Sequence, residues 1–446
     1  MDNKTIYALS TVFGKSGVAI FRVSGNAAFE VFAKMTTLPA EKIVARQMYF
    51  TPLLDSVSRE TLDHCMAVGF RAPHSFTGED TVEIHCHGSK AVIKSVIKAL
   101  SELPNYRLAE AGEFSRRAFY NGKMDLTEAD GLADLIDAET AIQQKTALQQ
   151  MGGTLLQRYD SWRNALVEIL SYVEAYIDFP DEDIPQDVVE NIENGVFKTA
   201  ETIREHLQGN HINERLRDGF RVVIAGPANA GKSSLINAIV KRNVAIVSDI
   251  AGTTRDVIDA YVDIKGYPVV FSDTAGLRDA ADEIEKIGIS LAKEKIAESD
   301  FKIFIFDAAT DGPEIFADYI KSGEDYVLVA NKIDKLSADV KQQLISKNCL
   351  LISAKHNENV DALVDRIYNH FNDLYLKANG GLITRQRYRE ALLECLENLD
   401  RFNLQKDIAL AAEDIRLACR AIGKITGRVE VDEILDKIFG SFCIGK

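Results

Sequence analysis

The stretch GPANAGKS at residues 226–233 constrains the fold more than any other part of the 446-residue chain. It follows the apolar run RVVIA and precedes SLINAIV, the order of strand, glycine-rich turn and helix that a phosphate-binding loop requires. Its glycines let backbone N–H groups surround a phosphate, and the start of a helix adds a favourable dipole. In such a loop Lys232 bridges the β- and γ-phosphates and Ser233 ligates Mg²⁺. The sequence therefore predicts a P-loop in an α/β domain.

Four more short apolar runs follow the P-loop, as expected for a mostly parallel sheet. They are PVVF, KIFIF, YVLVA and CLLIS, with helical patterns between them. We expect this α/β block to cover residues 218–378. Helical periodicity on both sides, over residues 122–217 and 379–446, predicts a discontinuous helical domain into which the block is inserted. Residues 1–121 mix short β-rich runs (GVAIFRV, HCMAVGF, TVEIHC) with helical stretches and form an α+β domain in this interpretation.

Polar motifs follow several of these runs, at the edge where the carboxyl ends of parallel strands meet. Asp273 of DTAG is placed to hold a magnesium-bound water. Asp334 of NKID is placed to accept both the N1–H and the exocyclic N–H of guanine, a donor pair that adenine lacks. The motif SAK at residues 353–355 supports the base, and a threonine of SDIAGTT at residues 248–254 completes the magnesium shell.

Together these motifs predict a domain that binds GTP or GDP with Mg²⁺. The residues assigned to nucleotide binding are Asn229, Ala230, Gly231, Lys232, Ser233, Ser234, Ser248, Asp249, Ile250, Ala251, Gly252, Thr253, Thr254, Asp273, Thr274, Ala275, Gly276, Asn331, Lys332, Asp334, Ser353, Ala354 and Lys355.

Leu277 stands after DTAG, where many GTPases have a glutamine that orients the attacking water. Three interpretations are open: binding without hydrolysis, a residue borrowed from a partner, or another catalytic device. Oxygens near the phosphates favour the third, because a monovalent cation held there neutralises charge as an arginine finger does. They belong to Asn229, Ser248, Ile250 and Thr253. Glu285 either orients the water or is one of several solvated acids in the first turn of a helix.

Several longer stretches resemble the tRNA-modification GTPases of the MnmE (TrmE) family. They are AGPANAGKSSLIN, IVSDIAGTTRDV, DTAGLRDAADEIEKIG, AGEFSRRAFYNGKMDL, ADLIDAET, YIDFPDEDI and the terminal FCIGK. The resemblance extends along essentially the whole chain, and the ending CIGK is especially diagnostic. It implies a multidomain α/β protein, with a folate-binding-like N-terminal domain that dimerises, a discontinuous helical domain and an inserted Ras-like GTPase domain.

The resemblance also implies roles for single residues. Ser233 and Thr254 hold magnesium, and the four residues named above hold potassium. Lys232 and Thr254 act at the phosphates, Glu285 orients the water and Arg278 helps to hold the switch loop. The positions that match the family's folate-binding residues are Arg22, Glu83, Lys123 and Lys446. Cys443 lies near the folate in the family and is either a chemical participant or a packing residue of the last helix.

The activity implied by the family is modification of the wobble uridine of certain tRNAs at carbon 5. GTP hydrolysis supports the reaction, and a one-carbon tetrahydrofolate supplies the methylene of an aminomethyl or carboxymethylaminomethyl group. A homodimer works with a separate FAD-dependent partner, MnmG (GidA), in a heterotetramer or larger complex. The alternative is a ribosome-assembly or regulatory GTPase that acts as a binding switch. For a ribosome-assembly GTPase we would expect a basic nucleic-acid module beside the GTPase domain.

The overall charge of −15 argues against a whole-protein electrostatic grip on nucleic acid. This acidity is consistent with a partner that carries much of the contact with tRNA. The 6 cysteines contain no closely spaced pair, which is typical of a reducing compartment. Because no apolar run approaches membrane-spanning length, we expect a cytoplasmic protein without membrane contact.

Overall fold

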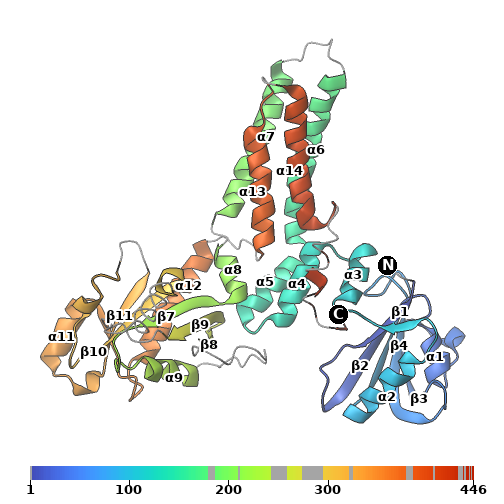
Figure 1. Ribbon diagram of the computed structural model, residues 1–446, viewed down its shortest axis with the longest axis horizontal. Coiled ribbons are helices and arrows are strands. Elements are labelled where there is room, and N and C mark those ends of the chain that lie inside the picture. The colour runs from blue at the N-terminus through green and yellow to red at the C-terminus, as the bar shows by residue number, and fades with distance from the viewer. Residues whose placement is uncertain are drawn as a thin grey trace, which may run out of the picture. The chain divides into compact units, whose positions relative to one another are not determined.

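The computed structural model describes residues 3–178, 186–208, 211–242, 259–273, 295–320, 325–377, 385–404, 407–429, 435, 438–440, 442 and 444–445. The chain forms two compact units. The first comprises Met1–Ala133, Met151–Arg163 and Cys419–Lys446, and the second comprises Asp134–Gln150 and Asn164–Ala418. Each unit contains its own six-stranded sheet (Figure 1).

The sheet of the first unit has the strand order β3-β4-β5-β2-β1-β6. Its strands are β1 (Thr5–Leu9), β2 (Ser16–Ser24), β3 (Met48–Leu54), β4 (Thr61–Phe70), β5 (Thr81–Gly88) and β6 (Tyr106–Leu108). Neighbouring strands are antiparallel, apart from the parallel pair β1–β6. The three β-rich runs predicted from the sequence are confirmed as β2, β4 and β5.

Alternation along β2 gives the first sheet two different faces. Phe21 and Val23 belong to a buried core with α1 (Glu30–Met35) and α2 (Lys90–Ser101). Arg22, between them in sequence, therefore lies on the opposite face. A short 3-10 helix (Ala40–Lys42) and helix α3 (Glu113–Tyr120) complete the N-terminal part of this unit.

The end of the chain packs into the first unit. Phe439 and Leu435 share an apolar cluster with Leu126 at the start of α4 (Leu126–Asp137). Ile444 forms an isolated antiparallel bridge with Ala111. The Ser10 hydroxyl donates a hydrogen bond to the Gly445 carbonyl over 3.2 Å. Ile444 and Gly445 are thus connected to the N-terminal part of the first unit.

The sheet of the second unit has the order β12-β11-β10-β7-β9-β8. Its strands are β7 (Phe220–Ala225), β8 (Asp259–Ile264), β9 (Tyr267–Asp273), β10 (Phe301–Asp307), β11 (Tyr326–Asn331) and β12 (Cys349–Leu351). All neighbouring pairs are parallel except β8–β9. The five runs predicted as strands are confirmed, and the edge strand β8 is an addition that the apolar runs did not indicate.

Both faces of this sheet are covered, which explains why its central strands are mostly apolar. One core joins the sheet to α9 (Lys232–Arg242) and α12 (Val360–Lys377). Within it the rings of Phe220 and Phe371 stack with centroids 4.2 Å apart. The other core includes Leu344 of α11 (Ala338–Ser346) and Phe316 of the 3-10 helix Pro313–Phe316.

The remaining described helices come from the sequence before and after the α/β block (Figure 1). They are α5 (Ala141–Met151), α6 (Thr154–Asp178), α7 (Gln186–Leu207), α8 (His211–Asp218), α13 (Gln386–Arg401) and α14 (Ile408–Thr426). Helix α7 packs against α13, and Arg416 of α14 pairs with Glu174 of α6 over 3.0 Å. The predicted discontinuous helical domain is confirmed by this arrangement. Across the described ranges, no helix combines the length and apolarity needed to cross a bilayer.

Candidate nucleotide-binding site

The P-loop leaves the carboxyl end of β7, and α9 begins at Lys232. Asn229 and Gly231 have φ angles of +65° and +100°, the left-handed region in which glycine has no steric penalty. A Cβ atom on Gly226 would lie 2.0 Å from the Ile305 carbonyl oxygen, and one on Gly231 would lie 2.2 Å from Asn331 Nδ2. The glycines at both ends of the motif are therefore required by the fold.

Lys232 is buried inside the loop that precedes it. Its Nζ donates hydrogen bonds to the carbonyl oxygens of Gly226 and Pro227, each over 3.0 Å. Ser233 and Ser234 are exposed in the first turn of α9. The loop thus holds an ammonium group and two hydroxyls at a helix N-terminus, which fits a bound phosphate and its magnesium ion.

Asn331, at the end of β11, connects its own NKID motif with the P-loop and with the SAK motif. Its buried side chain donates from Nδ2 to the Ala230 carbonyl over 2.8 Å and accepts at Oδ1 from the Ala354 N–H over 3.0 Å. Lys332 has φ of +65°, and its Nζ donates to the Asn229 carbonyl over 2.9 Å. The NKID motif therefore fixes the conformation of the P-loop as well as its own conformation.

Asp307 is a site residue that the sequence analysis missed. It ends β10 in register with Asn331, and its Oδ2 accepts a bond of 2.6 Å from Lys332 Nζ. Partial burial works to raise the pKa of Asp307, but the hydrogen bond and charge of Lys332 outweigh it and lower that pKa. The sequence contains the pattern that could have identified Asp307: a carboxylate directly after the strand-forming run KIFIF, as in the other motifs of this sheet edge.

Asp334 lies in the 3-10 helix Ile333–Lys335, beside the residues predicted to support the base. The Ser353 hydroxyl donates to Asp334 Oδ1 over 2.7 Å, and this bond is the main cause that lowers the pKa of Asp334. His356 Nε2 lies 3.8 Å from the other carboxylate oxygen, and Lys355 is exposed nearby in sequence. An ionised carboxylate held by one oxygen fits recognition of two guanine N–H groups.

One further predicted residue of this site, Asp273, belongs to the described part of the chain. Asp273 ends β9, with its backbone in register with Ile224 of β7. The following predicted residues lie outside the described part of the chain: Ser248, Asp249, Ile250, Ala251, Gly252, Thr253, Thr254, Thr274, Ala275, Gly276, Leu277, Arg278, Glu285, Cys443 and Lys446.

Two of the predicted folate residues meet in the first unit. Arg22 and Glu83 face each other across β2 and β5, and Glu83 Oε1 accepts bonds of 3.0 and 3.1 Å from Arg22. The Arg22 guanidinium lies 5.2 Å from the ring centroid of Phe76 and 5.8 Å from that of Phe114. Lys123 instead donates to the Pro73 carbonyl over 2.9 Å. A cation, a carboxylate and two aromatic rings thus share one face of the sheet, a donor set that fits a folate.

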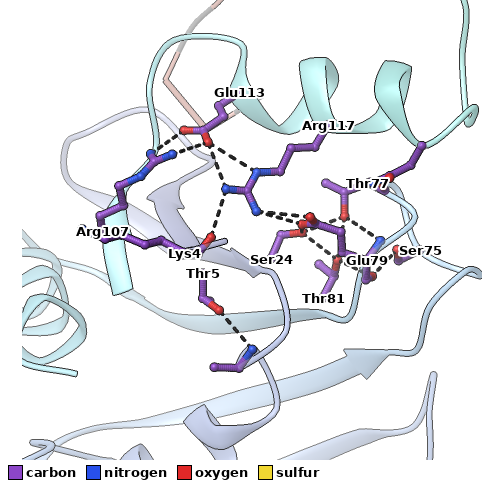
Figure 2. A network of polar contacts seen from close by, with 12 residues as sticks. Lys4, Thr5, Ser24, Ser75, Thr77, Glu79, Thr81, Arg107, Glu113 and Arg117 are labelled. Carbon is purple, nitrogen blue, oxygen red and sulfur yellow. Dashed lines mark hydrogen bonds and ion pairs between the residues drawn. The ribbon is translucent and has the colours of Figure 1, made fainter. Parts of the chain in front are cut away.

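An ion network with a buried centre, Glu113 and Arg117, and two partly exposed members, Arg107 and Glu79, lies in the same unit and is called the buried ion network (Figure 2). Arg117 pairs with Glu113 and with Glu79, each over 3.0 Å, and Arg107 pairs with Glu113 over 2.7 Å. Burial works to raise the pKa of Glu113, but hydrogen bonds from both arginines and from a backbone N–H lower it. Among the described residues, two arginines and two glutamates thus pair with one another here. No sequence motif considered above pointed to this network.

A P-loop beside a braced NKID motif, on a mostly parallel sheet, defines the class of P-loop GTPases, and the chain is an enzyme of the GTP-hydrolysing kind. The family model described as "MnmE helical domain" matches residues 126–443, and the model described as "GTP-binding protein TrmE N-terminus" matches residues 5–123. The chain belongs to the MnmE (TrmE) family.

Two curated relatives carry the name tRNA modification GTPase MnmE. The protein of Rickettsia bellii (strain RML369-C) is 46% identical over 446 residues, which is 99% of this chain and 100% of that protein. The protein of Rickettsia rickettsii (strain Sheila Smith) is 45% identical with the same coverage. A crystal structure of Aquifex aeolicus Era bound to GDP and AlF4− is 31% identical over 33% of this chain and 56% of its own. The TM-score between the two structures is 0.29.

Proposed function

We propose that this chain is a potassium-activated GTPase that modifies the wobble uridine of certain tRNAs at carbon 5, together with an FAD-dependent partner of the MnmG type. The product carries an aminomethyl or carboxymethylaminomethyl group, and a one-carbon tetrahydrofolate supplies the methylene. We assign this tRNA modification to a homodimer in the cytoplasm. One observation supports nucleotide binding most directly. Asn331 and Lys332 donate hydrogen bonds to the P-loop carbonyls of Ala230 and Asn229.

In this proposal the residues of the nucleotide site have separate tasks. Lys232 moves from its carbonyl partners to the β- and γ-phosphates. Asp334, kept ionised by Ser353, selects guanine. Ser233 and Thr254 would hold Mg²⁺, and Asn229, Ser248, Ile250 and Thr253 would hold K⁺. Both ions supply positive charge at the phosphate oxygens when they are bound. Glu285 orients the attacking water in place of the glutamine that Leu277 replaces.

Glu285→Ala tests the catalytic part. We expect GTP binding to persist and hydrolysis to fall by about 10²- to 10⁴-fold, because a positioned carboxylate that acts on the attacking water is lost. Phosphate release in saturating potassium measures the effect. Glu283→Ala, which removes a neighbouring acid, is the matched control and keeps its turnover. Equal turnover of the two variants would mean that Glu285 is only a solvated acid.

Replacing potassium by sodium at constant ionic strength tests the cation. Hydrolysis should slow strongly, because the larger ion is the one that the four proposed oxygens are expected to hold. A rate that does not change between the two salts would remove potassium from the proposal and leave GTP binding intact.

The folate part is supported by the grouping of Arg22 and Glu83 with Phe76 and Phe114. Lys123 and Lys446 would add positive charge for the glutamate tail, and Cys443 would lie near the reacting carbon. Titration of the full chain with 5-formyltetrahydrofolate should give saturable binding that Glu83→Gln weakens. The tRNA part is tested by mass spectrometry of wobble uridine in a strain that lacks the chain. An unaltered nucleoside profile would contradict the proposed role.

A further inference from the structure

Asp307 lies in the nucleotide site, but none of the roles proposed above uses its carboxylate. It ends β10, and its backbone is in register with Asn331 at the end of β11. Its Oδ1 accepts a hydrogen bond of 3.1 Å from the Ala309 N–H, and its Oδ2 accepts one of 2.6 Å from Lys332 Nζ. Each carboxylate oxygen therefore has its own donor. A carboxylate held at two points in this way fixes the position of the cation that it binds.

Lys332 is the cation that Asp307 binds. Its Nζ also donates to the Asn229 carbonyl of the P-loop over 2.9 Å, so the ammonium group connects the end of β10 with the phosphate-binding loop. The backbone of Lys332 has φ of +65°, a conformation that is uncommon for a residue with a side chain. Such a conformation persists where the surrounding contacts hold it, and the two contacts of the ammonium group do so here.

The direction of the Lys332 side chain matters because Asp334, the carboxylate proposed to select guanine, lies only two residues further along the chain. A lysine side chain is long and flexible, and an ammonium group released from Asp307 would be attracted to a carboxylate so close by. In the structure the Asp334 carboxylate instead accepts from the Ser353 hydroxyl over 2.7 Å, and His356 Nε2 lies 3.8 Å from its other oxygen. Asp307 thus keeps a competing cation away from the guanine-binding carboxylate.

Building on the role proposed above for Asp334, we propose that Asp307 is a positioning residue for guanine recognition. It neutralises Lys332 and directs the ammonium group to the P-loop. Asp334 is then free to accept both the N1–H and the exocyclic N–H of guanine. Without a carboxylate at position 307, Lys332 pairs with Asp334, and guanine has to displace it.

Asp307→Asn tests this role, because asparagine keeps an oxygen for the Ala309 N–H and loses the charge that holds Lys332. Calorimetric titration of the full chain with GDP and with inosine diphosphate, which lacks the exocyclic amino group, measures both affinities. The wild-type chain should prefer GDP by at least about tenfold, since inosine diphosphate leaves an acceptor of Asp334 unpaired. In Asp307→Asn the affinity for GDP should fall at least about tenfold, and the preference for GDP should shrink at least about threefold. A purely structural role would weaken the binding of both nucleotides equally.

Two further variants show whether the effect is specific. Asp311→Asn is the matched control in the same loop, because the Asp311 carboxylate accepts from the neighbouring Thr310 hydroxyl over 3.1 Å. It should keep the affinity and the preference. In a Lys332→Met background the competing ammonium group is absent, so adding Asp307→Asn should leave the ratio of the two affinities unchanged. Asp307→Ser, which also keeps an oxygen for the Ala309 N–H, provides the answer if Asp307→Asn does not fold.

Three results would overturn the proposed role of Asp307. A wild-type preference for GDP that survives undiminished in the Asp307 variants would contradict this role alone and leave that of Asp334 intact. A wild-type chain that does not prefer GDP would contradict the role of Asp334 as well. A change in the affinity ratio that is equally large with and without the Lys332 ammonium group would show that Asp307 does not act through Lys332.

Discussion

The P-loop and the buried ion network of the first unit hold positive charge in different ways. The described hydrogen bonds of Lys232 go to two backbone carbonyls, which carry only partial charge. Arg117 is matched by the full charges of Glu79 and Glu113 (Figure 2). A cation held by dipoles keeps most of its attraction for an incoming anion, whereas a cation neutralised by carboxylates contributes to the fold. The partners of a buried cation therefore distinguish a binding site from a structural element.

The largest expected effect on stability follows Arg117→Met. This variant leaves Glu113 and Glu79 short of a buried partner and should destabilise the first unit by about 3–5 kcal/mol. Denaturation of the full chain, with hydrogen exchange in β1 and β5, measures the loss. Lys98→Met is the control in the same unit, since the Lys98 side chain is 73% exposed and its pair with Glu102 contributes only about 0–1 kcal/mol. Equal losses of stability in the two variants would contradict the distinction between a buried and an exposed ion pair.

Lys232→Ala should have the opposite profile, with a large effect on catalysis and a small one on stability. We expect hydrolysis to slow by about 10²- to 10³-fold, because a charge that acts on the phosphates is removed. Phosphate release and a denaturation curve are measured together. Lys241→Ala, on the same helix and exposed, is the control. A Lys232→Ala variant that unfolds as easily as Arg117→Met would show that the lysine is structural.

Acid should weaken the ion network in a predictable direction. The pKa of Glu113 is lowered below its ordinary 4.5 by its arginine partners, in spite of burial. A lowered pKa stabilises the fold above pH 4.5, and this contribution is lost as the pH falls through the lower value. We therefore expect the first unit to lose stability as the pH falls below 4.5. Arg117→Met should flatten this pH dependence, and an unchanged slope would argue against the network as its source.

The smallest expected effect on stability comes from Arg22→Ala. Arg22 and Glu83 are 21% and 20% exposed, so their ion pair contributes about 0–1 kcal/mol. If the proposed folate site is correct, the same variant loses most of its affinity for 5-formyltetrahydrofolate. Arg71→Ala, which breaks another ion pair of the first unit, should keep that affinity. A large loss of stability in Arg22→Ala would place Arg22 with Arg117 as a structural residue.

The features that could be predicted are those that depend on residues close together in the sequence. Gly226 and Gly231 are needed because a Cβ atom would clash with neighbouring backbone or side-chain atoms, and such positions are visible in the spacing of a motif. The five apolar runs were recognised as strands because both faces of that sheet are buried. The edge strand β8 was missed, since its sequence DAYVDI mixes polar and apolar residues. The residues of the switch segments and the chain end remain predictions.

Local sequence patterns were sufficient to predict the P-loop, five of the six strands of the second sheet and the family, because these depend on neighbouring residues. The partners of the charged side chains follow from tertiary packing instead. Asp307 meets Lys332, and Arg22 meets Glu83, through the registers of paired strands. Gln143 reaches Tyr261 through helix packing. Such contacts join residues far apart in the chain, and no local pattern specifies them because each depends on how whole elements pack.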